Sequence, residues 1–200
     1  PSGIAYMSDR DQFLVVDSEV EEMSIYAGVN QWQLSRDGST LHETANTRKF
    51  SNEPTGIGYD PARRRAFVSA DGRNRIYEIT EGADNRFGTS DDPVTNFSTS
   101  DFGNLDPEDV TYDTRSGDLF VTDGVGLDVV RVSPGPNGRF DGVAPTGDDV
   151  ATRYDVGPYG ITDLEGIGYS PTRDSLFLAD RKYTQIVEVT KDGALVQSID

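Results

Sequence analysis

The segment Pro54–Thr80, PTGIGYDPARRRAFVSADGRNRIYEIT, carries the pattern on which the whole chain is built. It predicts a strand, a tight turn, a second strand, a short loop and a third strand. The pattern returns at Pro107–Ser133 and Leu164–Thr190, and a weaker version opens the chain at Pro1–Asp17. The repeats are aligned by Tyr6, Tyr59, Tyr112 and Tyr169, at spacings of 53, 53 and 57 residues. Self-similarity at a period of about 40–50 residues, with several strands per repeat, predicts a β-propeller.

Within each repeat the strands differ in character. The second strand is nearly all apolar, as in Ala66–Val68, which is typical of a strand covered on both faces. The third strand, such as Ile76–Ile79, alternates apolar and polar residues and should be half exposed. In the first and fourth repeats the Asp-Gly turns Asp37-Gly38 and Asp192-Gly193 predict a hairpin into a fourth strand.

The predicted fold is therefore all-β, a β-propeller with four blades of four antiparallel strands, in a single domain over 1–200. We expect the blades at about 1–53, 54–106, 107–163 and 164–200. The alternative is a fragment of a five- to seven-bladed propeller, and the start at Pro1, without Met, favours an excised domain or a processed chain. A closed ring of four blades would bury all four second strands and remain a monomer. A fragment would leave one apolar blade face bare at each end and would associate.

The charge of the chain excludes some partners. There are 35 acidic residues against 18 basic ones, for a net charge of −17. Such a charge repels nucleic acid and anionic membranes, whereas it suits cations. No apolar run approaches the ~20 residues of a membrane helix, so we expect no membrane insertion. Because there is no cysteine, disulfides are absent.

Two acidic insertions replace the tight turn in repeats two and three, at Glu81–Asp92 and Pro134–Asp149. Both contain Arg-Phe and end in Asp-Asp. Calcium takes about six to eight hard oxygen ligands at flexible geometry, and these loops are rich in them. A second interpretation is that Asp and Asn simply suit the turn backbone. We predict one Ca²⁺ ion in each insertion. The expected ligands are Asp84, Asn85, Asp91 and Asp92 in the first loop, and Asn137, Asp141, Asp148 and Asp149 in the second.

The repeat PTGIGYDPARRRAFVSADGRNRIYEI resembles repeats of the NHL type, and DLEGIGY at Asp163–Tyr169 resembles the blade start of SdiA-regulated and phytase-like propellers. As architecture, the resemblance covers nearly all of the chain. It implies that the Glu of that motif, matched by Glu165 and by Glu108, faces the central channel and binds calcium. Ser2 and Thr55 hold this position in the other two repeats, so a symmetric metal ring is not expected. The insertions are similar to calcium loops of secreted bacterial proteins.

Glu108 and Glu165 occupy equivalent positions, which a propeller places around one axis, so they should converge with Asp109 beside them. Neither motif contains Lys or Arg, and converging carboxylates share a proton or recruit a cation. We therefore predict a third, weaker Ca²⁺ site at the channel mouth, lined by Glu108 and Glu165, with coordination positions left open for a ligand.

An aspartate also ends each second strand, and two interpretations are open for this set. The four could form a ring around a cation, or each could cap its own loop by accepting backbone N–H groups. The second is favoured, because four carboxylates at one level repel one another. The residues are Asp17, Asp71, Asp123 and Asp180.

Nucleophilic catalysis finds little support. His42 is the only histidine and lies in a polar fourth strand, and no nucleophile or phosphate-loop motif is present. We expect a secreted or cell-surface bacterial protein, a calcium-binding propeller acting as a binding or structural module. The rival hypothesis is a calcium-dependent hydrolase of phosphoesterase or lactonase type, with its site at the channel mouth. The expected partner is an unidentified protein, glycan or small molecule, and we expect the protein to be a monomer.

Overall fold

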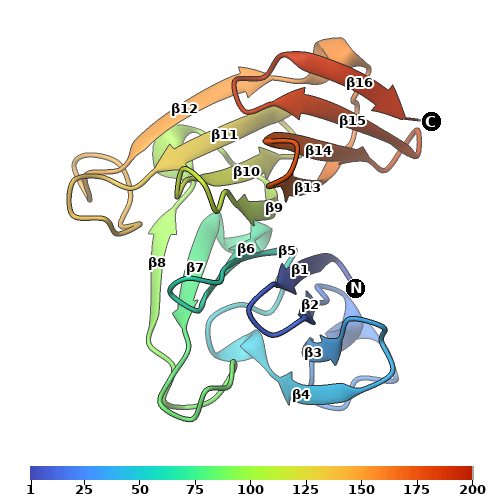
Figure 1. Cartoon of the computed structure of the whole chain (residues 1–200), viewed down its shortest axis with the longest axis vertical. Helices are drawn as coiled ribbons and strands as arrows, with labels where there is room; N and C mark the ends of the chain where they lie inside the picture. Colours follow the sequence, from blue (N-terminus) through green and yellow to red (C-terminus); the bar gives the residue numbers. More distant parts are fainter. Residues whose placement is uncertain (200) are drawn as a thin grey trace.

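The computed structural model describes residues 1–199, which form four four-stranded antiparallel sheets (Figure 1). Blade one consists of β1 (Gly3–Met7), β2 (Gln12–Val16), β3 (Gln31–Ser35) and β4 (Leu41–Ala45), and blade two of β5 (Gly56–Asp60), β6 (Arg65–Ala70), β7 (Arg75–Thr80) and β8 (Val94–Ser98). Blade three consists of β9 (Pro107–Tyr112), β10 (Leu119–Asp123), β11 (Asp128–Ser133) and β12 (Val150–Asp155), and blade four of β13 (Leu164–Ser170), β14 (Ser175–Asp180), β15 (Gln185–Thr190) and β16 (Leu195–Ile199).

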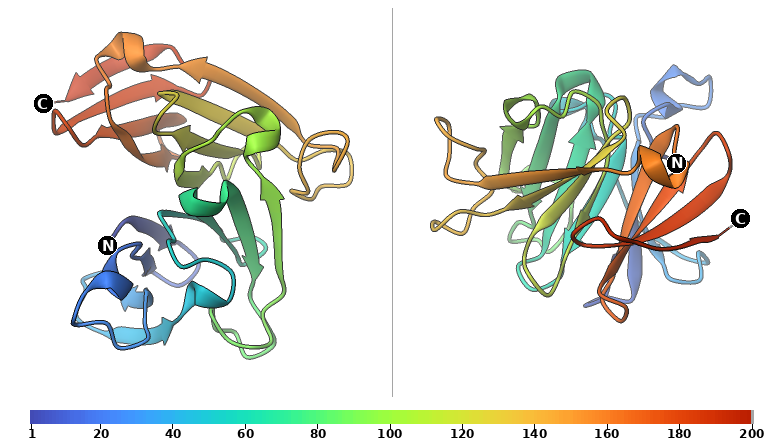
Figure 2. Two further views of the ribbon diagram at one scale, coloured as in Figure 1. Left: turned by 180° about the vertical axis from the view of Figure 1, so that it is seen from behind. Right: turned by 90° about the horizontal axis from the view of Figure 1, so that it is seen from above.

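In every sheet the strands follow one another in chain order, so each blade is a meander. The repeat tyrosines hold the same register, since Tyr59 pairs with Ala66 and Tyr112 pairs with Leu119. The four sheets follow one another in chain order around the molecule (Figures 1 and 2). The first strand of each blade contacts the first strand of the next, in the pairs β1–β5, β5–β9 and β9–β13. The prediction of an all-β propeller with four blades of four antiparallel strands is confirmed.

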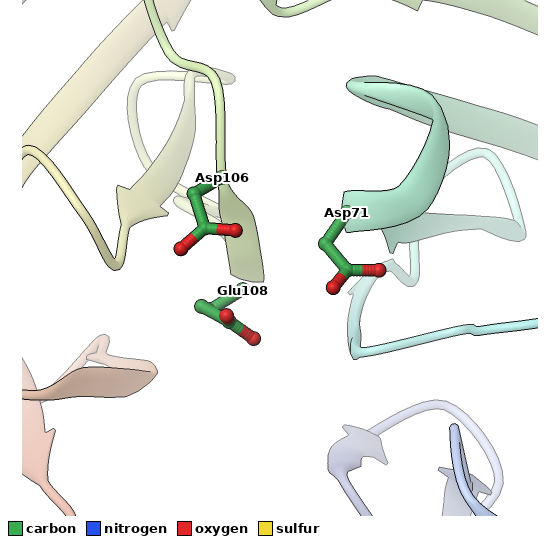
Figure 3. A group of neighbouring side chains, drawn as sticks. All are labelled: Asp71, Asp106 and Glu108. Carbon is green, nitrogen blue, oxygen red and sulfur yellow. The ribbon is translucent and has the colours of Figure 1, made fainter.

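Short 3-10 helices join the strands, and none of the described helices is longer than one turn. They are η1 (Val20–Glu22), η2 (Thr47–Lys49), η3 (Asp71–Arg73), η4 (Ser100–Phe102) and η5 (Gly157–Tyr159). Of these, η3 matters most for function, because it directs Asp71 toward the centre of the molecule (Figure 3).

The core consists of three apolar clusters, each between two neighbouring blades. Successive residues of a second strand contribute to different clusters, because side chains alternate across a strand. Val68 packs toward blade one, whereas Phe67 packs toward blade three. This double burial explains why the second strands are almost entirely apolar.

Blades four and one share no such cluster among residues 1–199. All residues of β6 and β10 are buried, but Phe13 in β2 and Phe177 in β14 are only half-buried. The burial expected of all four second strands in a closed ring is therefore wrong for the two end blades. The reason is that no sheet covers the outward face of blade one or of blade four.

Candidate metal centre

Three carboxylates meet at one mouth of the central channel, and each offers an oxygen within 4.8 Å of the others. Asp71 begins η3 of blade two, Asp106 lies in the loop before β9, and Glu108 lies in β9. Figure 3 shows Asp71 on one side, facing Asp106 and Glu108 on the other. Hard oxygen ligands in this number, from two different blades, are suited to Ca²⁺ or Mg²⁺.

Glu108 owes its position to a β-bulge. The β9–β10 register shifts between Val121 and Asp123, so that Glu108 and Asp109 together oppose one residue of β10. A similar shift at Leu164/Gly166 leaves Glu165 without a cross-strand partner in blade four. Blades one and two have no shift between their first and second strands. Bulges re-aim side chains, so the two glutamates are turned toward the mouth where an unbulged strand would not place them.

The mouth is a cavity of about 390 Å³ to which all four blades contribute. It is lined by Pro1, Ser2, Ser18, Glu19, Thr55, Asp71, Glu108, Glu165 and Arg181. Blade one supplies two hydroxyl groups, the carboxylate of Glu19 and the N-terminal ammonium group, which is paired with Asp17. Blades two to four supply carboxylates, and Arg181 supplies positive charge on the blade-four side. The cavity can thus hold a cation and an anionic group of a ligand side by side.

Glu108 and Asp106 lie in an environment that disfavours the ionised form of a carboxyl group. Burial, followed by the charges of Glu165, Asp106 and Asp71, raises the pKa of Glu108 to about 8. Burial and the neighbouring Asp71 also raise the pKa of Asp106. A raised carboxylate pKa means that the ionised form lacks compensation, which a bound cation would supply.

Blade four shows how the protein itself can provide that compensation. Arg181 follows the aspartate that ends β14, and its Nη1 lies 3.2 Å from Glu165 Oε1. Its Nε lies 4.0 Å from Asp163 Oδ2, so one guanidinium faces both carboxylates.

Blade three contains the same carboxylate pair, Asp106 and Glu108, but the residue equivalent to Arg181 is Gly124. A Cβ atom at Gly124 would lie 2.8 Å from Asp106 Oδ2 and 2.9 Å from Glu108 Cγ. The small residue thus brings the backbone close to the carboxylates and leaves them without an arginine of their own. Blade three therefore has the carboxylate pair of blade four without its guanidinium.

Asp109 was expected to lie with the carboxylates at the mouth, but its side chain does not belong to that cluster. Its Oδ1 accepts hydrogen bonds from the N–H groups of Ile57 and Val110, at 3.2 and 2.8 Å, and its Oδ2 accepts one from Ile167 at 2.9 Å. The side chain therefore ties the inner strands of blades two, three and four together. Burial raises its pKa to about 7, although the three N–H donors oppose the rise.

Three of the four aspartates that end second strands brace loops, as favoured from the sequence. Asp17 accepts from the N–H groups of Glu19 and Val20, Asp123 from Gly126, and Asp180 from Thr162 and Tyr183. Asp71 also accepts from the adjacent Gly72, yet it alone belongs to the mouth cluster. A ring of four aspartates is therefore not formed.

The first insertion brings Asp84, Asp91 and Asp92 together, with an oxygen of each within 4.8 Å of the others. Asp92 is buried and braces the loop, since it accepts from the N–H groups of Gly82, Gly88 and Thr89. Asp84 and Asp91 are exposed and face outward to solvent.

Asn85 has a different partner from the one predicted. Its Oδ1 accepts a hydrogen bond from Arg64 Nη1 at 3.1 Å, and its backbone is left-handed, with φ of 59°. This is the turn role that was the second interpretation of the loop composition. Phe87, two residues further on, is buried between blades one and two, which explains the phenylalanine of the Arg-Phe pair.

The second insertion repeats this arrangement with Asp141, Asp148 and Asp149. Asp149 is buried and accepts from the N–H groups of Asp141 and Gly142, at 3.0 and 2.8 Å. Asn137 donates to Asp141 Oδ2 at 2.8 Å and so supports the cluster from its edge. Phe140 anchors the loop between blades two and three, in the same way as Phe87 in the first insertion.

Sequence reasoning missed Asp106, although a signal was present. Asp106 precedes Glu108 by two residues, as Asp163 precedes Glu165, so the pair repeats in both blades. His42 lies exposed on β4, the outermost strand of blade one, and does not line this cavity. Among residues 1–199, no helix has the length and apolar character needed to cross a membrane.

No protein-family model matches the sequence, and no curated protein matches it either. Solved structures are similar in fold. A chain of the nidogen/laminin complex matches with a TM-score of 0.61 and 16% identity, over 96% of this chain and 60% of that one. A putative gluconolactonase matches with a TM-score of 0.59 and 14% identity, over 97% of this chain and 59% of that one.

A catalytically inactive virginiamycin B lyase from Staphylococcus aureus also matches, with a TM-score of 0.52 and 16% identity, over all of this chain and 69% of that one. The chain thus spans about 60% of the length of the first of these structures. At such low identity the similarity concerns the fold alone, and that fold is the β-propeller.

Proposed function

We propose that this propeller is a calcium-binding module that presents a cation at its channel mouth to an anionic group of a ligand. The cation would be held by Asp71, Asp106 and Glu108. The single observation that carries the proposal is the crowding of three carboxylates with no arginine of their own, in contrast to the arginine-paired carboxylates of blade four.

Two features favour a ligand site over a purely structural ion. Three monodentate carboxylates supply fewer than the about six to eight oxygens that Ca²⁺ takes, so positions remain for a ligand or water. Arg181 lines the same cavity. A carboxylate or phosphate of the ligand could therefore bridge the ion and the guanidinium.

The rim insertions are proposed as structural Ca²⁺ sites, with Asp84 and Asp91 in one loop and Asp141 and Asp148 in the other as the exposed ligands. Small sites of this kind bind weakly, with Kd values of about 10⁻⁴–10⁻³ M in extracellular modules. Such affinities are useful only where calcium is plentiful. A secreted or cell-surface location is accordingly part of the proposal.

The rival function is a calcium-dependent hydrolase at the same mouth. The specific observation in its favour is that Glu108, a member of the cluster, has a pKa of about 8, since a general acid or base works best with a pKa near the operating pH. Some structures of similar fold are described as gluconolactonases, which adds a lactone to the substrates worth testing.

The test counts bound ions. Terbium titration and anomalous diffraction from lanthanide-soaked crystals should find one mouth ion and two rim ions in the parent protein. The double variant Asp106→Asn/Glu108→Gln should lose only the mouth ion. Glu165→Gln is the matched control, because Glu165 is already paired with Arg181, and it should keep all three. Unchanged ion binding in the double variant would contradict the proposal.

A second measurement separates the two functions. Hydrolysis of lactones and phosphoesters is followed with and without Ca²⁺ in the parent and in the double variant. Calcium-dependent turnover that disappears in the double variant would replace the binding module by the hydrolase at the same site. Absence of turnover, with the mouth ion present, supports the binding module.

A further inference from the structure

The first rim insertion contains a tight turn in the segment 82–87, GADNRF. The N–H group of Asn85 donates to the carbonyl oxygen of Gly82 at 3.3 Å, which closes the turn. The N–H group of Arg86 donates to Asp84 Oδ1 at 3.0 Å. Asp84 is also a member of the carboxylate cluster of this loop. The turn therefore positions one carboxylate in the cluster.

The second rim insertion contains the same turn. The N–H group of Gly138 donates to the carbonyl oxygen of Gly135 at 2.9 Å. The N–H group of Arg139 donates to Asn137 Oδ1 at 2.7 Å. Asn137 therefore holds the position that Asp84 holds in the first insertion. At this position the second loop has an amide where the first loop has a carboxylate.

The residue after Asn137 makes this amide chemically labile. Asn137 is exposed, and it is the only asparagine in the sequence that is followed by glycine. The Cγ atom of an asparagine can be attacked by the backbone nitrogen of the next residue, and glycine hinders this approach least because it has no Cβ atom. The hydrogen bond from Gly138 to Gly135 must open first, which slows the reaction in the folded loop without preventing it.

We propose that Asn137 deamidates spontaneously and so gives the second rim loop the carboxylate that the first loop has in Asp84. The nitrogen of Gly138 loses its proton and bonds to Asn137 Cγ, and the side-chain nitrogen leaves as ammonia. Solvent water then opens the cyclic imide. Cleavage of the new bond gives aspartate, whereas cleavage between the same nitrogen and the backbone carbonyl carbon of Asn137 gives isoaspartate. Either product carries one new carboxyl group, and only water is consumed.

The new carboxylate would lie beside a cluster that is already negative. The amide of Asn137 donates to Asp141 Oδ2 at 2.8 Å, and a carboxylate in its place repels Asp141 instead. The loop should therefore be less stable without a cation. With calcium, the additional charged ligand should tighten binding in this loop roughly tenfold, since ligand charge sets the affinity of such sites. This calcium effect rests on the proposed rim sites, whereas the deamidation does not.

The first experiment follows the mass of the tryptic peptide 132–139, in which Asn137 is the only asparagine. The folded chain is incubated at physiological temperature at neutral and at alkaline pH, and a sample digested without incubation gives the baseline. We expect the mass increase of an amide-to-acid conversion in this peptide, faster at alkaline pH because the attacking nitrogen must lose its proton. An unchanged peptide, or equal changes at the other asparagines, would overturn the proposal.

Gly138→Asn is the matched control, because it reproduces Asn85 of the first loop. Gly138 has a φ of 69° and Asn85 a φ of 59°, so the turn accepts asparagine at this position. The variant should fold as the parent does and lose most of the mass change at Asn137, which tandem mass spectrometry reads separately from position 138. A variant in which Asn137 deamidates as fast as in the parent would contradict the role of the glycine.

The calcium effect is measured in the Asp106→Asn/Glu108→Gln background, which should leave only the rim ions. Asn137→Asp reproduces the aspartate product, and Asp84→Asn makes the reverse change in the first loop. Terbium titration should show one rim ion bound roughly tenfold more tightly in Asn137→Asp and one bound more weakly in Asp84→Asn. Unchanged rim affinities would overturn the calcium effect. If no rim ion binds in any of these proteins, the proposed rim sites fail, while the mass of peptide 132–139 still decides the deamidation.

Discussion

Calcium binding at the channel mouth is expected to release a proton from Glu108. With a pKa of about 8, roughly ten protonated molecules exist for each ionised one at pH 7. Because Ca²⁺ binds the ionised carboxylate, each ion bound at pH 7 should release about 0.9 proton. Affinity at the mouth should rise about tenfold per pH unit below pH 8 and level off above it.

The raised pKa of Glu108 also determines whether the stability of the calcium-free protein rises or falls with pH. The pKa of Glu108 is raised from 4.5 in the unfolded chain to about 8 in the folded protein, so the folded state holds the proton more tightly. Stability should therefore fall as pH rises from about 4.5 to about 8, and bound Ca²⁺ should reduce this fall.

Calorimetry in buffers of different protonation enthalpy gives the number of protons released per ion. The Glu108→Gln variant serves as the reference, because protons exchanged elsewhere in the molecule should be nearly the same in both proteins and cancel in the difference. A mouth affinity that does not change between pH 6 and pH 8, with no difference in proton release from the variant, would refute the reasoning.

Three further predictions concern stability. A Cβ atom at Gly56 would lie 2.0 Å from Asp109 Oδ1, so Gly56→Ala should lower the free energy of unfolding, measured by urea denaturation, by about 3 kcal/mol. Gly168→Ala is the control, because a Cβ atom there meets no atom within 4 Å and should leave the denaturation curve nearly unchanged. Equal effects of the two substitutions would contradict this reasoning. Asp92→Ala removes the acceptor of three backbone N–H groups and should lower the free energy of unfolding by about 1–3 kcal/mol with or without EDTA. Asp91→Ala removes hydrogen bonds from Thr89 and from the N–H group of Asp84, and should lower the melting temperature more in Ca²⁺ than in EDTA. An equal loss in both conditions would remove Asp91 from the proposed ligands.

The blades could be predicted from the sequence because each of their strands has a local signature. A second strand covered by two neighbours must be apolar throughout, as Ala66–Val68 is, and the turns that join strands need Asp, Pro or Gly. The acidic insertions were equally visible, since their carboxylates are close in sequence as well as in space.

The mouth was only partly predictable, because it depends on side-chain direction. Alternation along β9 fails at the bulge, so nothing local says that Glu108 enters the cluster while Asp109 accepts hydrogen bonds from backbone N–H groups. Asp106 and Asp71 become neighbours through the packing of two blades. The bare end faces were expected only for the fragment alternative, and the sequence did not decide between that alternative and the closed ring, since Ile4 has the same sequence context as the buried Ile57.

The hydrogen bonds of Asp109 bear on the order in which the molecule folds. Its partners Ile57 and Ile167 lie 52 and 58 residues away in the chain, whereas each blade is closed by hairpins between consecutive strands. Local contacts form before distant ones, because closing a long loop loses more chain entropy. We expect the sheets to exist before Asp109 joins them, so that its loss would speed unfolding and hardly slow folding. One carboxylate would then set how long the assembled blades stay together.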